Sequence, residues 1–91
     1  MEQVAKHIVF TGQVQGVGFR FTALHIANRC HLTGYVRNRP DSAVEMLAQG
    51  PAELIDDCIR DIEESFAEYI REIDVQPATL DPNLSDFRIT F

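Results

Sequence analysis

The sequence predicts an α+β fold in which two helices lie on one face of an antiparallel sheet. Three observations lead to this fold. Short β-branched and aromatic runs alternate with two stretches of helical hydrophobic period, turn residues separate the second strand from the third, and the resulting order is β-α-β-β-α-β with a short C-terminal fifth strand. That order is typical of the ferredoxin-like sandwich. The length of 91 residues predicts a single domain over residues 1–91.

The first part of the chain gives strand, loop and helix signals in turn. Ile8–Thr11 is β-branched and aromatic and predicts a strand, whereas residues 12–18 contain three glycines and predict a loop. The period then changes to that of a helix, with an apolar stripe formed by Phe19, Ala23, Ile26, Ala27 and Cys30. Gly34 is expected at the turn just past the end of this helix.

A hairpin follows the first helix. Tyr35–Arg37 and Val44–Ala48 predict the second and third strands, and the turn residues between them, 40–43, predict a tight connection.

The rest of the chain predicts a second helix and two strands. Gly50-Pro51 opens the helix, because proline suits a first-turn position. Its apolar positions recur at helical spacing: Leu54, Ile55, Cys58, Ile59, Ile62 and Phe66. Ile70–Val75 predicts the fourth strand, residues 77–82 a loop, and residues 87–91 the closing strand.

Charge is unevenly distributed along the chain. The net charge of −6 argues against a nucleic-acid binder, yet residues 1–39 carry +4 and residues 40–91 carry −10. A small anion is therefore expected to bind the first part. No apolar run is long enough to span a membrane, and the N-terminus has no signal-peptide pattern, so we expect a cytoplasmic protein without membrane contact.

The loop before the first helix combines the features of an oxyanion site. Gly16 and Gly18 can adopt positive φ at little cost, so successive backbone N–H groups can converge on one point at a helix start. Arg20 can add two parallel N–H donors. The alternative is a plain tight turn with an arginine on the surface. The Walker and Rossmann patterns both fail here, because no GKS or GKT and no third glycine follow.

Other polar residues carry weaker signals. The three histidines, at positions 7, 25 and 31, do not form a metal set and are expected to be solvated or half-buried. Cys30 and Cys58 lie on apolar stripes and are expected to be buried small residues without a redox role. Asp41 is expected to shape the hairpin turn, and Asn38 on its own could end a strand through an Asx turn.

Two motifs together resemble the acylphosphatase family. They are Gly12-x-Val14-Gln15-Gly16-Val17-Gly18-Phe19-Arg20 and Gly34-Tyr35-Val36-Arg37-Asn38, at the spacing that this family uses. The resemblance implies a ferredoxin-like hydrolase that cleaves the carboxyl–phosphate bond of small acyl phosphates without metal. We also expect a monomer that uses no other cofactor. Inorganic phosphate would be the product and a competitive inhibitor. The resemblance to the family also implies which residues form the site. Arg20 and the backbone amides of Gln15, Gly16, Val17, Gly18 and Phe19 would bind the phosphoryl group, and Asn38 would hold the attacking water.

The implied chemistry needs few protein groups, so a chain of this size can supply them. A carboxylate leaving group has a conjugate acid of pKa about 4, so it departs without a general acid. The loose transition state of phosphoryl transfer needs mainly positioning and charge stabilisation. A cradle of amides, one arginine and one amide side chain that holds water could supply both.

Two segments depart from the family pattern. The hairpin turn has Asp41-Ser42 where the family usually has Asp-Gly, and serine tolerates positive φ less well than glycine. Residues 65–69 replace the usual glycine and proline, so the second helix is expected to run longer.

Two further functions compete with a free-standing enzyme. One is a non-catalytic module of the same fold that binds phosphate or another anion, which intact Arg20 and Asn38 disfavour. The other is a domain of a larger carbamoyl-transfer machine, which is disfavoured because the chain ends directly after its last predicted strand.

Overall fold

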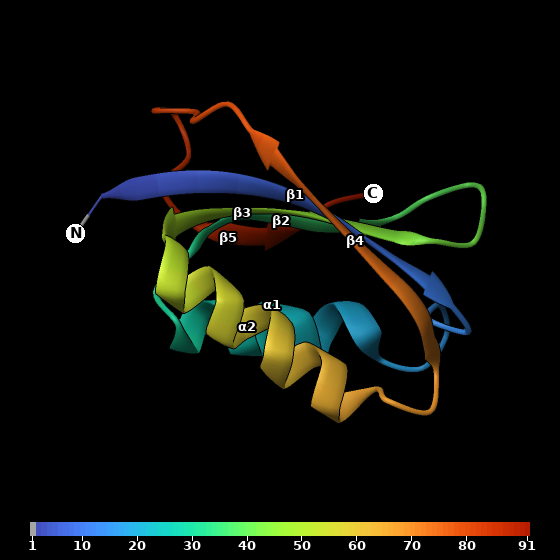
Figure 1. Cartoon of the computed structure of the whole chain (residues 1–91). Helices are drawn as coiled ribbons and strands as arrows, with labels where there is room; N and C mark the ends of the chain where they lie inside the picture. The colour runs from blue at the N-terminus through green and yellow to red at the C-terminus, as the bar shows by residue number, and fades with distance from the viewer. Residues whose placement is uncertain (1) are drawn as a thin grey trace.

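The computed structural model describes residues 2–91 and contains two helices and five strands (Figure 1). In chain order these are β1 (Gln3–Gly12), α1 (Phe19–Arg29), β2 (Thr33–Asn38), β3 (Val44–Pro51), α2 (Ala52–Ser65), β4 (Ile70–Ala78) and β5 (Phe87–Ile89). The predicted order of elements is confirmed. The first four strands are longer than predicted, and the last is shorter.

The strands form one sheet in the order β4-β1-β3-β2-β5. Neighbours among β1 to β4 pair antiparallel, as the sequence predicts, but β5 pairs parallel with β2 and makes the sheet mixed. Both helices cover the same face, and the other face is open (Figure 1). None of the helices within residues 2–91 is long and apolar enough to cross a membrane.

The core lies between the helices and the covered face of the sheet. Alternation along β1 directs Ile8 and Phe10 into it, where both are fully buried. Aromatic rings connect the layers: the ring centroids of Phe10 and Phe19 are 4.9 Å apart, and those of Phe19 and Phe66 are 4.7 Å apart. Because Phe19 is the first residue of α1, this packing fixes where the helix begins.

The end of α1 corrects one prediction. The residue with left-handed backbone is His31, with φ 57°, and not Gly34. The His31 N–H donates to the Asn28 carbonyl at 3.1 Å, and the Leu32 N–H donates to the Ala27 carbonyl at 3.0 Å, which is the Schellman pattern. Gly34 instead lies within β2, where a Cβ would overlap the Leu47 carbonyl oxygen. Glycine at position 34 is therefore needed for the close approach of β3 to β2, and it does not terminate the helix.

The end of α2 corrects another prediction. The helix stops at Ser65 and does not continue toward Tyr69. Phe66 is buried against the core, and its carbonyl accepts the N–H groups of Tyr69 at 2.9 Å and Ile70 at 3.0 Å. Burial of this ring turns the chain into β4 without glycine or proline. β4 then includes Pro77, which is tolerated because β4 lies at an edge of the sheet.

Candidate active site

The glycine-rich segment forms the connection between β1 and α1, as predicted. The connection follows Gly12, at which a β-bulge interrupts the pairing of β1 with β4, and its first residue is anchored because the Gln13 N–H donates to the Tyr69 carbonyl at 2.8 Å. Gly16 and Gly18 have φ of 79° and 78°, and a Cβ on either would meet nothing within 4 Å. These glycines are therefore required by backbone conformation and not by crowding, and the space beside them is open.

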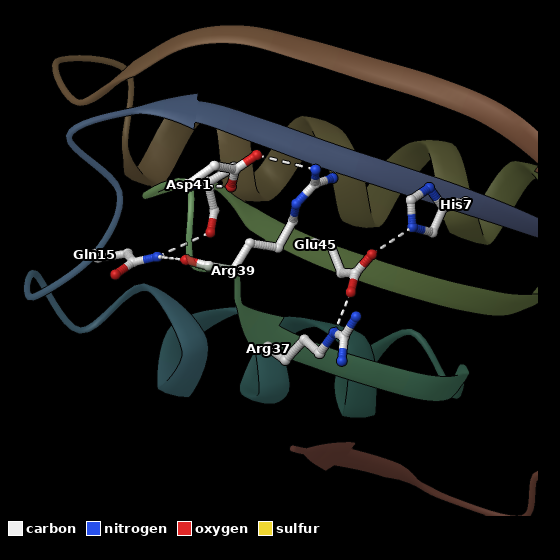
Figure 2. A network of polar contacts seen from close by, with 7 residues as sticks. His7, Gln15, Arg37, Arg39, Asp41 and Glu45 are labelled. Atoms are coloured by element: carbon white, nitrogen blue, oxygen red, sulfur yellow. Dashed lines mark hydrogen bonds and ion pairs between the residues drawn. The ribbon is translucent and has the colours of Figure 1, made fainter. Parts of the chain in front are cut away.

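The loop is anchored from two sides. The Val14 side chain is buried in the core. The Gln15 side chain points to the β2–β3 hairpin, where its Nε2 donates to the carbonyls of Arg39 at 2.9 Å and Ala43 at 3.0 Å (Figure 2). From the sequence, only the backbone amide of Gln15 is expected to have a role, in binding the phosphoryl group. Its side chain tethers the loop to a segment about 25 residues away, a contact that no local pattern indicates.

The hairpin turn is closed by the residues that depart from the family pattern. Ser42 adopts positive φ, 74°, and its N–H donates to the Arg39 carbonyl at 3.2 Å. The Asp41 carboxylate accepts the Ala43 N–H at 3.2 Å, so Asp41 shapes the turn as expected. The Arg39 N–H also donates to the Ala43 carbonyl at 2.8 Å, so the connection proper is residues 40–42, and a three-residue connection with a left-handed residue at its last position is a common hairpin form. Serine thus fills the conformation for which glycine is usual.

The N-terminus of α1 presents backbone donors next to the loop. Its N-cap is Gly18, no side chain caps it, and its first turn contains no acidic residue. The N–H groups of the first turn and the positive end of the helix dipole therefore remain free for an anion. Arg20, the second residue of the helix, is half-buried, and its guanidinium lies 5.3 Å from the centre of the Phe91 ring. None of the ion pairs found within residues 2–91 uses Arg20.

Asn38 is the last residue of β2 and pairs with Val44 of β3. Alternation along β2 places it on the same face as fully buried Val36, which is the face that carries the helices. The Thr90 N–H donates to the Val36 carbonyl at 2.9 Å, and the neighbouring Phe91 ring lies over Arg20. The end of β2 and the start of α1 thus lie at the same end of the molecule, where the loop and the hairpin also meet (Figure 1).

The open face of the sheet carries a separate polar network. The buried Glu45 carboxylate contacts His7 Nε2 at 2.8 Å and accepts a hydrogen bond from Arg37 Nε (Figure 2). Burial alone raises the pKa of Glu45, but the hydrogen bonds and charges of His7 and Arg37 outweigh it and hold the pKa below its usual value. Since Glu45 and Asn38 lie on opposite faces, this network does not belong to the loop site.

The remaining residues that the sequence singled out lie outside the loop. His25 and His31 are exposed and His7 is half-buried, as expected. Within residues 2–91 no group of three or more histidine, cysteine or acidic side chains is arranged to hold a metal ion. Cys58 is buried as expected, but Cys30 is only partly buried.

Comparison with known proteins gives a consistent result. The model of the Acylphosphatase family matches residues 6–89. An acylphosphatase of Chlorobaculum tepidum is 38% identical over 90 residues, which cover 98% of each chain. The crystal structure of acylphosphatase from Bacillus subtilis superposes with a TM-score of 0.87 at 28% identity, covering 97% of this chain and 99% of that one. The structure of T. kodakarensis HypF gives a TM-score of 0.84 at 30% identity, covering 97% of this chain but only 12% of HypF.

Proposed function

The chain belongs to the acylphosphatase family and is an acylphosphatase, and from that premise we propose that Arg20, Asn38 and the loop amides carry the reaction. The substrates in this proposal are small acyl phosphates. The products are a carboxylate and inorganic phosphate.

One observation carries the proposal: α1 begins with uncapped amides, no acid and an arginine, directly after a loop with two left-handed glycines. Each of these features favours a negative charge at that point. Arg20 can donate two parallel N–H bonds to phosphoryl oxygens, and the backbone N–H groups of residues 15–19 can donate to the same group from the other side. The tether from Gln15 to the hairpin holds the loop for this purpose before substrate arrives.

Asn38 acts on the water in this proposal. Its side-chain oxygen accepts a hydrogen bond from water, and its nitrogen donates one, so the side chain can aim a water at phosphorus. The water attacks in line while the carboxylate departs on the opposite side. The carboxylate needs no proton, and the loose transition state needs no strong base. The proton of the attacking water passes to solvent or to the phosphate formed.

The proposal assigns all neutralisation of charge to the protein itself. Other phosphoryl-transfer enzymes use a metal cation to neutralise the charge of the phosphoryl group. In this proposal Arg20 and the backbone donors neutralise that charge, so neither a metal nor another cofactor takes part. We further propose that residues 1–91 act as one domain, as a monomer in the cytoplasm. The match to a curated relative over nearly its whole length supports action as a free-standing unit.

Steady-state hydrolysis of acetyl phosphate tests the proposal. We expect turnover, competitive inhibition by inorganic phosphate, and unchanged activity in excess chelator. A loss of activity in chelator that magnesium restores would overturn the metal-free mechanism. Phosphate binding at Arg20 without any turnover would identify the chain as an anion-binding module of the same fold.

A further inference from the structure

The aromatic ring of Phe91 lies against the guanidinium of Arg20. The distance from Arg20 Cζ to the ring centre is 5.3 Å, which is within the range of a cation–π contact. Arg20 is half-buried, whereas Phe91 is 98% exposed. Burial in the core therefore does not account for the position of the ring, and attraction to the cation does.

The chain reaches this position as a continuation of β5. β5 pairs parallel with β2 as far as Val36, and the Thr90 N–H then donates to the Val36 carbonyl at 2.9 Å. This bond holds the backbone directly before Phe91. Because parallel strands run in the same direction, the residues that follow β5 advance toward the end of β2, which is Asn38. Phe91 is thus held at the end of the molecule where α1 begins.

An aromatic ring can hold an arginine without occupying its hydrogen-bond donors. The face of the ring attracts the positive charge but offers no carboxylate or carbonyl oxygen to the N–H groups. None of the ion pairs within residues 2–91 involves Arg20, so no acid in that range competes with a phosphoryl group for it. A substrate would have to displace a carboxylate from Arg20, but it need not displace the ring.

We propose that Phe91 is a positioning residue, which holds the Arg20 guanidinium beside the start of α1 with its N–H donors free. This inference rests on the proposed function, since it takes Arg20 as the group that binds the phosphoryl oxygens. Phe91 acts through Arg20 and touches neither the phosphoryl group nor the water. Restriction of the long arginine side chain before substrate arrives reduces the entropy that is lost on binding. A contact at an exposed site is weak, so its loss should weaken phosphate binding by about two- to fivefold.

The test measures phosphate binding to the full chain and compares four replacements of the ring. They are Phe91→Trp, Phe91→Tyr, Phe91→Leu and Phe91→Ala. An NMR titration that follows the Arg20 Nε–H signal gives the dissociation constant of inorganic phosphate, and acetyl phosphate hydrolysis gives kcat and KM. Phe21→Leu, which removes another exposed ring from the helix that carries Arg20, is the matched control.

We expect the two aromatic variants and the control to bind phosphate as the wild type does. The leucine and alanine variants should bind about two- to fivefold more weakly, with a matching rise in KM and a kcat that changes less than about twofold. Leucine separates the possible roles, because it keeps an apolar side chain and removes the π face. Without phosphate, the Arg20 Nε–H signal should move in the leucine variant, since the ring current is lost. Because Phe91 is exposed, all four variants should fold.

Several results would overturn the inference. Wild-type phosphate affinity in the leucine variant, or an equal loss in the aromatic variants, would show that the π face is not used. Tighter binding without the ring would show that Phe91 holds Arg20 away from the phosphoryl group. An unmoved Arg20 signal in the leucine variant would show that the ring does not contact the guanidinium.

Failure of the proposed function would give a different pattern. A wild type that binds phosphate at Arg20 but does not hydrolyse acetyl phosphate would refute the enzymatic activity alone. The order of phosphate affinities among the four variants would then still decide the role of Phe91. A wild type that binds no phosphate would overturn both.

Discussion

The two helices begin in opposite ways, although each follows a strand of the same sheet. Between β1 and α1 lie six residues, Gln13–Gly18, and the second residue of the helix is Arg20. Between β3 and α2 there is no connection at all: Pro51 ends the strand and caps the helix, and the second residue of the helix is Glu53. Equivalent positions at the two helix starts thus carry opposite charges.

This difference shows how one fold assigns an anion site to one helix start and not to the other. At α2 the carboxylate of Glu53 satisfies the helix dipole from within the chain. At α1 no acid does so, and the dipole and the loop amides remain available to a ligand. The positive first part and the negative second part of the chain follow the same division. Substitutions at four positions can break or sharpen this comparison.

Removal of the cation at α1 should have the largest effect. Two charge-assisted hydrogen bonds contribute about 3–6 kcal/mol, so Arg20→Ala should lower kcat/KM for acetyl phosphate by about 10² to 10⁴. Arg20→Lys should also be poor, because a point charge cannot donate two parallel bonds. Arg29→Ala, at the exposed far end of α1, is the matched control. Near-normal activity of the lysine variant would exclude a bidentate role.

Asn38→Ala should separate the hydrolysis step from phosphate binding at the end of the molecule where α1 begins. Misplacement of the attacking water should lower kcat by on the order of 10², while the inhibition constant of phosphate changes less than about threefold. Asn38→Asp should fare no better, because its carboxylate repels the phosphoryl oxygens. A parallel loss of phosphate affinity would instead assign Asn38 to the shape of the cradle.

Gln15→Ala should show how far the loop before α1 depends on the side-chain bonds from Gln15 to the hairpin. The start of α2 has no loop and needs no such bonds. The carbonyls of Arg39 and Ala43 each keep one backbone donor but lose the bond from Gln15, so the free energy of unfolding should fall by about 1–2 kcal/mol. The phosphate inhibition constant should rise by up to about tenfold as the loop loosens. Gln76→Ala, an exposed glutamine of β4, controls for loss of an amide. If stability falls and phosphate affinity does not, the tether serves the fold alone.

Glu53→Gln should have the smallest effect and act on stability only. Loss of the acid at the start of α2 should lower the free energy of unfolding by less than about 1 kcal/mol, because Glu53 is exposed. Urea unfolding measures this, with Glu68→Gln, outside the helix, as the control. Kinetics with acetyl phosphate and phosphate should match the wild type. A change in phosphate affinity would mean that the two helix starts are not independent.

The sequence predicted what depends on local pattern and missed what depends on distant contact. Hydrophobic period and turn residues predicted the order of elements, and the glycines at 16 and 18 predicted a left-handed loop, which the structure confirms. The role of Gly34 was mistaken because the constraint on it comes from the backbone of β3, not from the preceding helix. The end of α2 was mistaken because burial of Phe66, a tertiary contact, decides it.

The candidate site divides in the same way. Its backbone part could be predicted from glycine spacing and a helix start, since both are local. The side-chain contact of Gln15 with the hairpin, the positive φ of Ser42 and the position of Phe91 over Arg20 could not, because each joins segments that only folding brings together. The roles of Arg20 and Asn38 came from family resemblance and stay predictions.

The sheet has two unpaired edges, and each is poorly suited to recruit a strand from another molecule. β5 lies at one edge and has only three residues, too few to template a long ladder. β4 lies at the other edge and carries Arg71, Glu72 and Asp74 along its length, with Pro77 near its end. Charges and a proline on an edge strand oppose edge-to-edge growth. The protein should therefore resist ordered aggregation at high concentration, and removal of these edge features should shorten the lag before fibrils form.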